Sequence, residues 1–377
     1  MIHDDQQSQP WQASLTLRII RKLRMDPFLL FCIMLLTIMG LIVLYSAGDE
    51  SMALINRQAT RLLIAYGVLL FFTHVPSSTL SFWSPWIFGI GVILLVLVLV
   101  MGDIGKGAQR WLDLGFVRFQ PSEMMKLATP MMVAWFFSDR ALPPSYKNIG
   151  IAMLLLLLPT FLIARQPDLG TALLIFTAGF FVVFLAGLRW RIILGFMLSA
   201  AALLPVLWHF MHDYQRTRVM TLLYPERDPL GAGYHIIQSK IAIGSGGLYG
   251  RGWLNGTQSH LDFLPEQSTD FIFAVFAEEF GLIGGILLLL LYLLIVWRGL
   301  MIATTAQDTY GRLLAGSLSL TFFVYLFVNV GMVSGILPVV GVPLPLISYG
   351  GTSMVTLMAG FGMLMSINTR RKMWSSR

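Results

Sequence analysis

The run FLLFCIMLLTIMGLIVLYSA, Phe28–Ala47, indicates the fold class of this chain, because it contains no Asp, Glu, Lys or Arg. About 20 apolar residues in a helix are enough to cross the hydrocarbon core of a bilayer. Nine further stretches are similar in character, so we predict an all-α polytopic membrane protein with about ten transmembrane helices. The ten expected spans are Phe28–Ala47, Leu62–Val75, Trp83–Met101, Glu123–Ser138, Ile149–Ala164, Thr171–Gly187, Ile192–Met211, Phe271–Trp297, Leu313–Ile336 and Leu344–Ile367.

The composition agrees with this fold class. The chain is 56% hydrophobic and 12% charged, whereas a soluble domain has about 25% charged residues. The net charge of +7 does not indicate a nucleic-acid partner, since Lys and Arg flank membrane spans to fix their orientation. Cys32 is the single cysteine and lies in an apolar run, so neither a disulfide framework nor a zinc motif is expected.

The distribution of positive charge predicts the orientation. Arg18, Arg21, Lys22 and Arg24 precede the first span without a small-residue cleavage site, so we expect an anchored N-terminus. Ten spans place both termini on one side, and the excess of Lys and Arg there assigns it to the cytoplasm. We therefore expect one membrane domain over 1–377, with cytoplasmic tails at 1–27 and 368–377 and a large periplasmic loop at 212–270 between helices 7 and 8.

That loop is expected to carry the chemistry. Connections of this length in compact proteins are usually functional or disordered, and this one has too many Trp, Tyr, Ile and Leu to be disordered. Tyr234, Ile237 and Ile241 recur at helical spacing and predict a short interfacial helix. The glycine-rich run Gly244–Gly252 allows two interpretations, a flexible turn or a loop that holds phosphate through its N–H groups.

Cations at or near the outer face run against the orientation rule and predict an anionic ligand, since Arg and Lys bind phosphate well. The alternative is that each long side chain merely reaches the lipid headgroups. Within the fourth span, Glu123 and Lys126 are three residues apart and can meet on one helix face. The cations of this group are Lys106, Arg110, Arg118, Lys126 and Arg165.

Two aspartates, Asp168 and Asp270, are expected on the same outer side of the membrane as these cations. Asp168 can cap the sixth span or line an outer cavity with Arg165 and Lys126. Asp270 precedes the eighth span, where it can act as a helix cap or as a general base at the mouth of that cavity. At least one of Glu278 and Glu279, two turns deeper, must face protein or water.

The last outer connection contains Pro338, Pro343 and Pro345. Three prolines at membrane depth break helical bonding, which is tolerated only where the backbone is buried in protein or lines a cavity.

Taken together, these stretches resemble the SEDS family (shape, elongation, division and sporulation), most closely its rod-shape-determining members in Gram-negative bacteria. The resemblance covers nearly the whole chain, and the combination of its strings is more specific than any one of them. The matching strings are Lys106-Gly107-Ala108-Gln109-Arg110-Trp111, Gln120-Pro121-Ser122-Glu123, Gln166-Pro167-Asp168-Leu169-Gly170, Asp228-Pro229-Leu230-Gly231-Ala232-Gly233-Tyr234, Gln238-Ser239-Lys240, Leu264-Pro265-Glu266, Thr269-Asp270-Phe271, Pro343-Leu344-Pro345 and Ser348-Tyr349-Gly350-Gly351.

The resemblance implies a peptidoglycan glycosyltransferase of the bacterial cell inner membrane that polymerises lipid II into β-1,4 glycan strands during cell elongation. Its substrates would be lipid II and a glycan linked to undecaprenyl pyrophosphate. Its partners would be a class B penicillin-binding protein and other membrane proteins of the elongation complex. A divalent cation, Mg or Mn, is compatible with this chemistry.

The family's essential acidic residue falls on Asp270, the expected general base of an inverting transfer. Its conserved acid and lysine in the fourth span fall on Glu123 and Lys126. The expected substrate-binding residues are Lys106, Arg110, Glu123, Lys126, Arg165, Asp168 and Lys240.

Three other functions remain open at this point. A lipid II flippase would use the same cationic cavity but needs ligand-binding groups along a full path across the membrane. A secondary transporter would have broken helices at the midplane and inverted repeats. This sequence has no inverted repeats, and its large outer loop also argues against a transporter. A non-catalytic scaffold for cell-wall assembly would retain function in folded variants of Asp270, Glu123 and Lys126.

Overall fold

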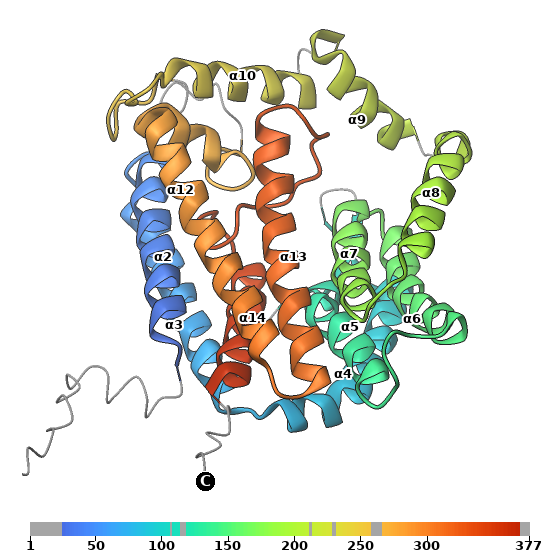
Figure 1. Cartoon of the computed structure of the whole chain (residues 1–377). Helices are drawn as coiled ribbons and strands as arrows, with labels where there is room; N and C mark the ends of the chain where they lie inside the picture. Colours follow the sequence, from blue (N-terminus) through green and yellow to red (C-terminus); the bar gives the residue numbers. More distant parts are fainter. Residues whose placement is uncertain are drawn as a thin grey trace, which may run out of the picture.

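The computed structural model describes residues 25–105, 108–113, 118–210, 213–227, 231–257 and 266–369. Within them, one long helix lies at each of the ten predicted spans, and these helices run up and down in one bundle (Figure 1). Five of them, α2, α4, α6, α12 and α13, are long and apolar enough to cross a membrane by length and composition alone. The ten helices are α2 (Pro27–Ala47), α3 (Met52–His74), α4 (Ser77–Met101), α5 (Pro121–Ser138), α6 (Tyr146–Arg165), α7 (Leu169–Leu185), α8 (Trp190–Phe210), α12 (Ile272–Thr305), α13 (Thr309–Val333) and α14 (Thr352–Thr369).

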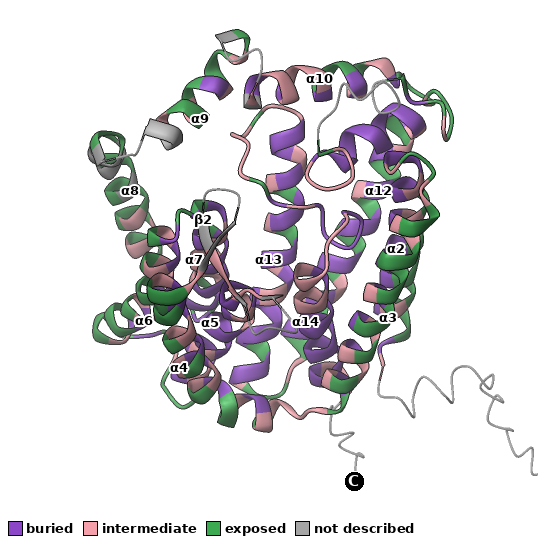
Figure 2. Cartoon of the chain, turned by 180° about the vertical axis from the view of Figure 1, so that it is seen from behind, coloured by how far each residue is buried: buried purple, intermediate pink, exposed green. Residues whose placement is uncertain are grey.

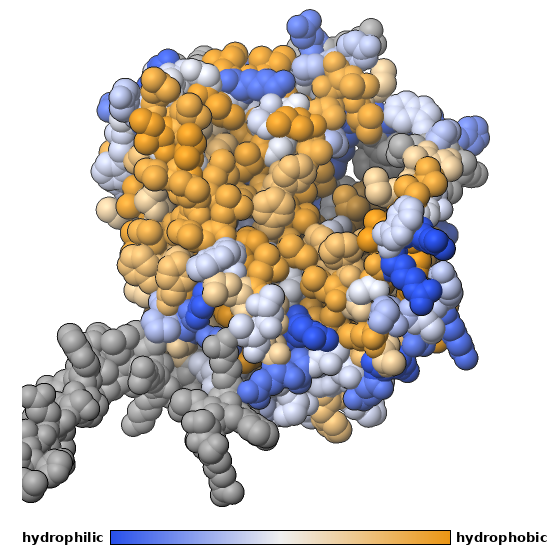
Figure 3. Space-filling view, in the orientation of Figure 1, coloured by the Kyte–Doolittle hydropathy of each residue, from blue (hydrophilic) through white to orange (hydrophobic). Residues whose placement is uncertain are grey.

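The outer surface of the bundle is apolar, as a bilayer requires. Figure 3 shows a broad hydrophobic face over α2, α12 and α13, with hydrophilic residues gathered towards its two ends. Large apolar side chains of α12 and α13, such as Leu287, Leu290 and Phe327, are exposed. The chain is therefore a polytopic helical membrane protein, as the sequence predicts.

Helix starts follow the local sequence. The Asp26 side chain accepts a hydrogen bond from Leu29 N at 2.9 Å, and Pro27 occupies the first helical position of α2. Asp168 caps α7 in the same way through Thr171 N at 3.3 Å, as predicted. Such side chains satisfy N–H groups that the first helical turn leaves without partners.

The centre of the bundle is formed by α5, α13 and α14, which are the most buried helices in Figure 2. Small residues let backbones approach closely here. A Cβ added to Gly362 of α14 would lie 2.5 Å from Leu69 O of α3. Ser317 Oγ of α13 donates a hydrogen bond to Ala178 O of α7 at 2.6 Å.

The two ends of the described chain meet on one side of the bundle. Asp26, which is 1% exposed, accepts hydrogen bonds from Arg298 Nε at 3.1 Å and from Asn368 Nδ2 at 2.7 Å. The start of α2 and the end of α14 are thereby tied to α12. An even number of crossings, as predicted, produces this arrangement.

The long loop crosses the opposite end of the bundle (Figure 1). It contains α9 (Asp213–Leu223), a 3-10 turn (Pro225–Arg227) and α10 (Ala232–Ser245). The helix expected around Tyr234 is confirmed as α10, whereas α9 was not predicted. An antiparallel ribbon of β1 (Asp103–Gly105), β2 (Ala108–Asp113) and β3 (Arg118–Phe119), also unforeseen, lies between α4 and α5.

The glycine-rich run packs against a break in α12, which is a role that neither of the two sequence interpretations proposed. Gly281 has φ +67°, which interrupts the helix. The carbonyls of Glu278 and Glu279 accept from Arg251 N and Gly252 N, both at 3.0 Å, instead of from residues four positions further along α12.

The reciprocal bonds complete this exchange. Leu282 N and Ile283 N donate to the carbonyls of Gly247 and Leu248 at 2.9 and 3.1 Å. A Cβ on Gly250 would lie 2.0 Å from Glu279 O, so glycine is required by close backbone contact.

The two glutamates themselves are buried, as at least one was expected to be. Glu278 and Glu279 are 0% and 1% exposed. Glu278 Oε1 accepts from Thr257 N at 2.9 Å, and Glu279 Oε1 accepts from Leu254 N at 3.2 Å. Both carboxylates therefore hold the loop against α12.

The last span begins later than predicted, at Thr352 rather than Leu344. Residues 338–351 are non-helical, in agreement with the predicted break by the prolines. Ser348 fixes this segment, since its Oγ accepts from Leu344 N at 2.7 Å and donates to Thr269 O at 2.6 Å. Local capping within the segment thus replaces the helical turns that we expected there.

Candidate active site

A polar cavity of roughly 520 Å³ opens among α5, α7, α9, α13 and the non-helical segment before α14. Among the described residues, three cations and three carboxylates line it together with backbone and hydroxyl groups. Its charged lining residues are Arg110, Glu123, Lys126, Asp168, Arg218 and Asp270. Of the eight residues expected at the site, five are thus brought into one cavity.

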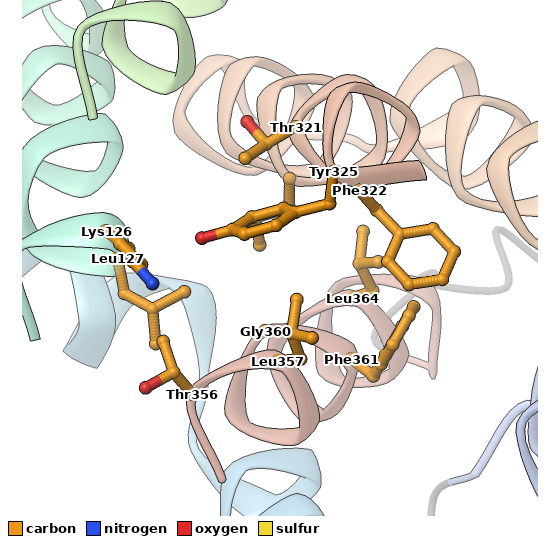
Figure 4. A pocket seen from close by; sticks show the side chains of 11 residues that line it. Lys126, Leu127, Thr321, Phe322, Tyr325, Thr356, Leu357, Gly360, Phe361 and Leu364 are labelled. Atoms are coloured by element: carbon orange, nitrogen blue, oxygen red, sulfur yellow. The ribbon is translucent and has the colours of Figure 1, made fainter. Parts of the chain in front are cut away.

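Glu123 and Lys126 form the buried ion pair that their spacing predicts. Lys126 Nζ lies 2.7 Å from Glu123 Oε1, and each side chain is 10% exposed. Lys126 Nζ also lies 5.4 Å from the centroid of the Tyr325 ring of α13. Figure 4 shows the side chains of Lys126 and Tyr325 facing each other between α5 and α13. The ammonium group is held between a carboxylate and an aromatic ring, which fixes its position on the cavity wall.

Arg110 and Asp168 form a second pair across the cavity mouth. Arg110, on β2, places Nε 3.5 Å from Asp168 Oδ2 and donates from Nη2 to Pro167 O at 2.7 Å. Asp168 caps α7 and also lines the cavity with Lys126, although Arg165, which was expected beside it, is not part of the lining. The ribbon is attached in this way to the turn between α6 and α7.

Asp270 lies on the cavity wall and does not cap α12. The helix begins at Ile272 with Phe271 as its cap residue, and no side chain makes a cap hydrogen bond there. Asn329 Nδ2 donates to the carbonyls of Asp270 at 2.9 Å and of Val342 at 2.8 Å. This amide joins the aspartate backbone to the proline-containing segment, so that both sides of the cavity are set by one buried side chain.

Two of the expected residues lie elsewhere. Arg165 is exposed, and its guanidinium lies 5.1 Å from the Phe161 ring centroid, outside the cavity lining. Lys240 is exposed on α10 and packs its side chain close to Gly335. Lys106 and the side chain of Arg118 lie outside the described part of the chain.

Sequence reasoning missed Arg218 and Tyr325, which both line the cavity. Arg218 lies on α9, within the loop that was expected to carry the chemistry, but the weak periodicity there gave no helix on which to place it. Tyr325 is 3% exposed in the middle of α13. Its signal was a polar group inside an apolar span, of the same kind that singled out Lys126.

An apolar groove of roughly 770 Å³ adjoins the cavity. It runs along α3, α5 and α14 and is lined by Ile64, Val68, Phe72, Leu127 and Val355, among others. The groove and the cavity share four lining residues, Trp111, Glu123, Gly351 and Thr352. An amphiphilic molecule can therefore lie with its polar part in the cavity and its apolar part in the groove.

Within the described residues, no three His, Cys, Asp or Glu side chains lie together as a metal-binding group. Two of the carboxylates in the cavity are already paired with Lys126 and Arg110.

A helical membrane bundle with a charged cavity beside an apolar groove defines a class of membrane protein that can hold an amphiphilic molecule. Comparison with known sequences then identifies the family. The profile of the FtsW/RodA/SpoVE family, described as cell cycle protein, matches residues 26–373. The chain belongs to this family, which is the SEDS family that its motifs resemble.

Individual relatives agree with this assignment. The peptidoglycan glycosyltransferase MrdB of Escherichia coli (strain K12) is 56% identical over 355 residues, covering 94% of this chain and 96% of its own. MrdB of Helicobacter pylori (strain J99 / ATCC 700824) is 40% identical over 310 residues, covering 80% of each.

Solved structures show the same fold. A chain from a structure described as the structural coordination of polymerization and crosslinking by a peptidoglycan synthase complex matches with a TM-score of 0.81 at 31% identity, covering 93% of this chain and 99% of its own. The rod shape determining protein RodA of Thermus thermophilus matches with a TM-score of 0.70 at 28% identity, covering 92% and 98%.

Proposed function

We propose that this protein is a peptidoglycan glycosyltransferase that polymerises lipid II into β-1,4 glycan strands. The MrdB protein of Escherichia coli, which is 56% identical to this chain, is named a peptidoglycan glycosyltransferase. The observation that carries the proposal is a carboxylate, Asp270, on the wall of a cavity that also presents Arg110 and Lys126.

The substrates follow from the lining of the two spaces. The apolar groove has the character needed for a polyisoprenoid chain, and the cavity has room for sugars. Arg110, Lys126 and Arg218 supply positive charge for a pyrophosphate, which Arg binds through paired hydrogen bonds. Glu123 holds Lys126 in place rather than binding the anion itself.

Asp270 is the general base of the transfer. Its carboxylate accepts the proton of the acceptor 4-hydroxyl as that oxygen attacks the anomeric carbon of the lipid-linked growing chain. The bond between this carbon and the pyrophosphate oxygen breaks, and undecaprenyl pyrophosphate leaves with the bonding electrons. One such displacement inverts the anomeric configuration, and the cations offset the charge that develops on the leaving group.

We assign the face with α9 and α10 to the periplasm and the two chain ends to the cytoplasm of the bacterial inner membrane. The meeting of both described ends at Asp26 and Asn368 supports a common side for the termini. The solved structure of a peptidoglycan synthase complex among the matches supports a class B penicillin-binding protein as partner, together with other membrane proteins of the elongation complex.

Polymerisation of purified lipid II, read as glycan chains on a gel, tests the proposal. Wild type, Asp270→Asn and the control Glu226→Gln are compared with the penicillin-binding partner present. Glu226 is an exposed carboxylate of the same loop that does not line the cavity.

We expect chains from wild type and Glu226→Gln, and at least a roughly 10²-fold lower rate from Asp270→Asn, the scale of general base catalysis. A wild-type rate in Asp270→Asn would remove this residue from the chemistry. If wild type produces no chains, lipid II translocation across vesicles is measured next, since a flippase would then account for the cavity.

A further inference from the structure

Arg61 of α3 is a charged residue that directly precedes the predicted start of a membrane span at Leu62, and its role has not yet been explained. It lies nine residues after the start of α3 at Met52, which corresponds to roughly 14 Å along the helix at about 1.5 Å per residue. The residue lines the apolar groove rather than the polar cavity.

The guanidinium of Arg61 has an aromatic partner and forms no ion pair within the described residues. Its Cζ lies 4.4 Å from the centroid of the Tyr349 ring. Tyr349 is held in turn by its backbone N–H, which donates to Ser268 O at 2.9 Å. By contrast, Arg110, Arg251 and Arg298 each have a carboxylate within 4.0 Å. Stacking positions the plane of the guanidinium and leaves its N–H donors for another anion.

The position of this guanidinium coincides with the boundary between groove and cavity. Its Nε lies 3.5 Å from where a Cβ at Gly351 would stand, and Gly351 lines both spaces. A lipid diphosphate has its charged group between an apolar tail and a sugar. When the tail lies in the groove and the sugar in the cavity, the diphosphate comes to lie beside Arg61.

We propose that Arg61 binds a phosphate group of the polyisoprenyl diphosphate substrate where the groove meets the cavity. This inference rests on the proposed function and adds a binding residue to it. A membrane phospholipid headgroup offers the same phosphate chemistry, so the test must separate the two sources.

The experiment measures binding of undecaprenyl pyrophosphate to the full-length protein in nanodiscs, read by Trp fluorescence, since Trp111 lines both spaces. Arg61→Gln and Arg61→Lys are compared with wild type. Arg140→Gln is the control, because Arg140 also stacks on an aromatic ring, at 3.8 Å from the Phe136 centroid, but lines neither space. Undecaprenol, which has no phosphate, is the control ligand.

We expect Arg61→Gln to weaken binding of undecaprenyl pyrophosphate by roughly tenfold or more, the scale of one charge-assisted hydrogen bond. Arg61→Lys should recover part of this loss, and undecaprenol should bind all variants alike. In polymerisation, Arg61→Gln should raise the KM for lipid II more than it lowers kcat.

Equal binding of undecaprenyl pyrophosphate by wild type and a folded Arg61→Gln would overturn the inference while leaving the glycosyltransferase proposal standing. A loss confined to phosphatidylglycerol, measured by native mass spectrometry, would also overturn it and assign the residue to a structural lipid. Binding that depends on Arg61 in a protein that makes no glycan would support the site and refute the proposed function.

Discussion

The Glu123–Lys126 pair offers a sharp quantitative prediction, because its two charges are buried inside the membrane bundle. Lys126 Nζ makes a 2.7 Å contact with Glu123 Oε1, and Glu123 Oε2 has no hydrogen-bond partner among the described residues. Removing Lys126 therefore leaves a carboxylate without its counter-charge. Breaking a buried pair costs about 3–5 kcal/mol. We expect the lower end, about 3 kcal/mol, for Lys126→Met because the pair lines a cavity that admits water.

Glu123→Gln should destabilise the protein by a similar amount, since it leaves the ammonium group buried alone. The double variant removes both charges, so its free energy of unfolding should return close to that of wild type. The coupling energy of the cycle should then be about 6 kcal/mol in magnitude, the sum of the two single losses. Polymerisation of lipid II should stay lost in the double variant, because the cation that binds substrate is absent.

Equilibrium unfolding of the four proteins in detergent micelles measures this cycle, and a gel of glycan chains measures activity. A coupling energy below about 1 kcal/mol, the range of exposed pairs, would refute the reasoning that the pair is desolvated. Full activity in the stable double variant would remove Lys126 from substrate binding.

Two further predictions concern packing. Gly250→Ala should destabilise the protein by about 2 kcal/mol or more, because its Cβ would meet Glu279 O at 2.0 Å. The control Gly244→Ala, whose Cβ would meet nothing within 4 Å, should be neutral or slightly stabilising. Equal unfolding midpoints for the two variants would contradict this account. Tyr325→Phe keeps the ring beside Lys126 and should change the free energy of unfolding by less than about 1 kcal/mol. Tyr325→Leu removes the ring and should lower the free energy of unfolding by about 1–2 kcal/mol more. Thermal unfolding of both variants measures the difference, and equal losses would argue against the ring contact.

The number and order of the spans could be predicted because the bilayer imposes a length of apolar helix that composition alone reveals. Boundaries were less accessible. Met52–Arg61 of α3 contains Asn56, Arg57 and Arg61 and reads as polar, yet it is helical with only Gln58 buried, because a helix can extend beyond its apolar stretch. The segment before Thr352 reads as apolar, yet prolines and the Ser348 hydrogen bonds keep it non-helical.

Site residues could be predicted where a local sequence rule identifies them, but not where tertiary contacts determine which side chains reach the cavity. The spacing of Glu123 and Lys126 and the capping position of Asp168 identify these residues directly. Arg165 and Arg110 are equivalent in sequence terms, since both are outer-side arginines, but only Arg110 reaches the cavity. The difference depends on the ribbon that carries Arg110, whose short strands leave little signal in the sequence.

The break in α12 determines how readily segment 247–252 separates from the bundle. At Gly281 two helical hydrogen bonds have been exchanged for four bonds to the segment 247–252. Peeling this segment away would break all four bonds together and leave their carbonyl and N–H groups without protein partners, which is unfavourable. The amides of Arg251, Gly252, Leu282 and Ile283 should therefore exchange with deuterium together and slowly, as one cooperative unit. Segment 247–252, although it lies on the surface of the bundle, should therefore open only as slowly as α12, the helix that Asp270 precedes.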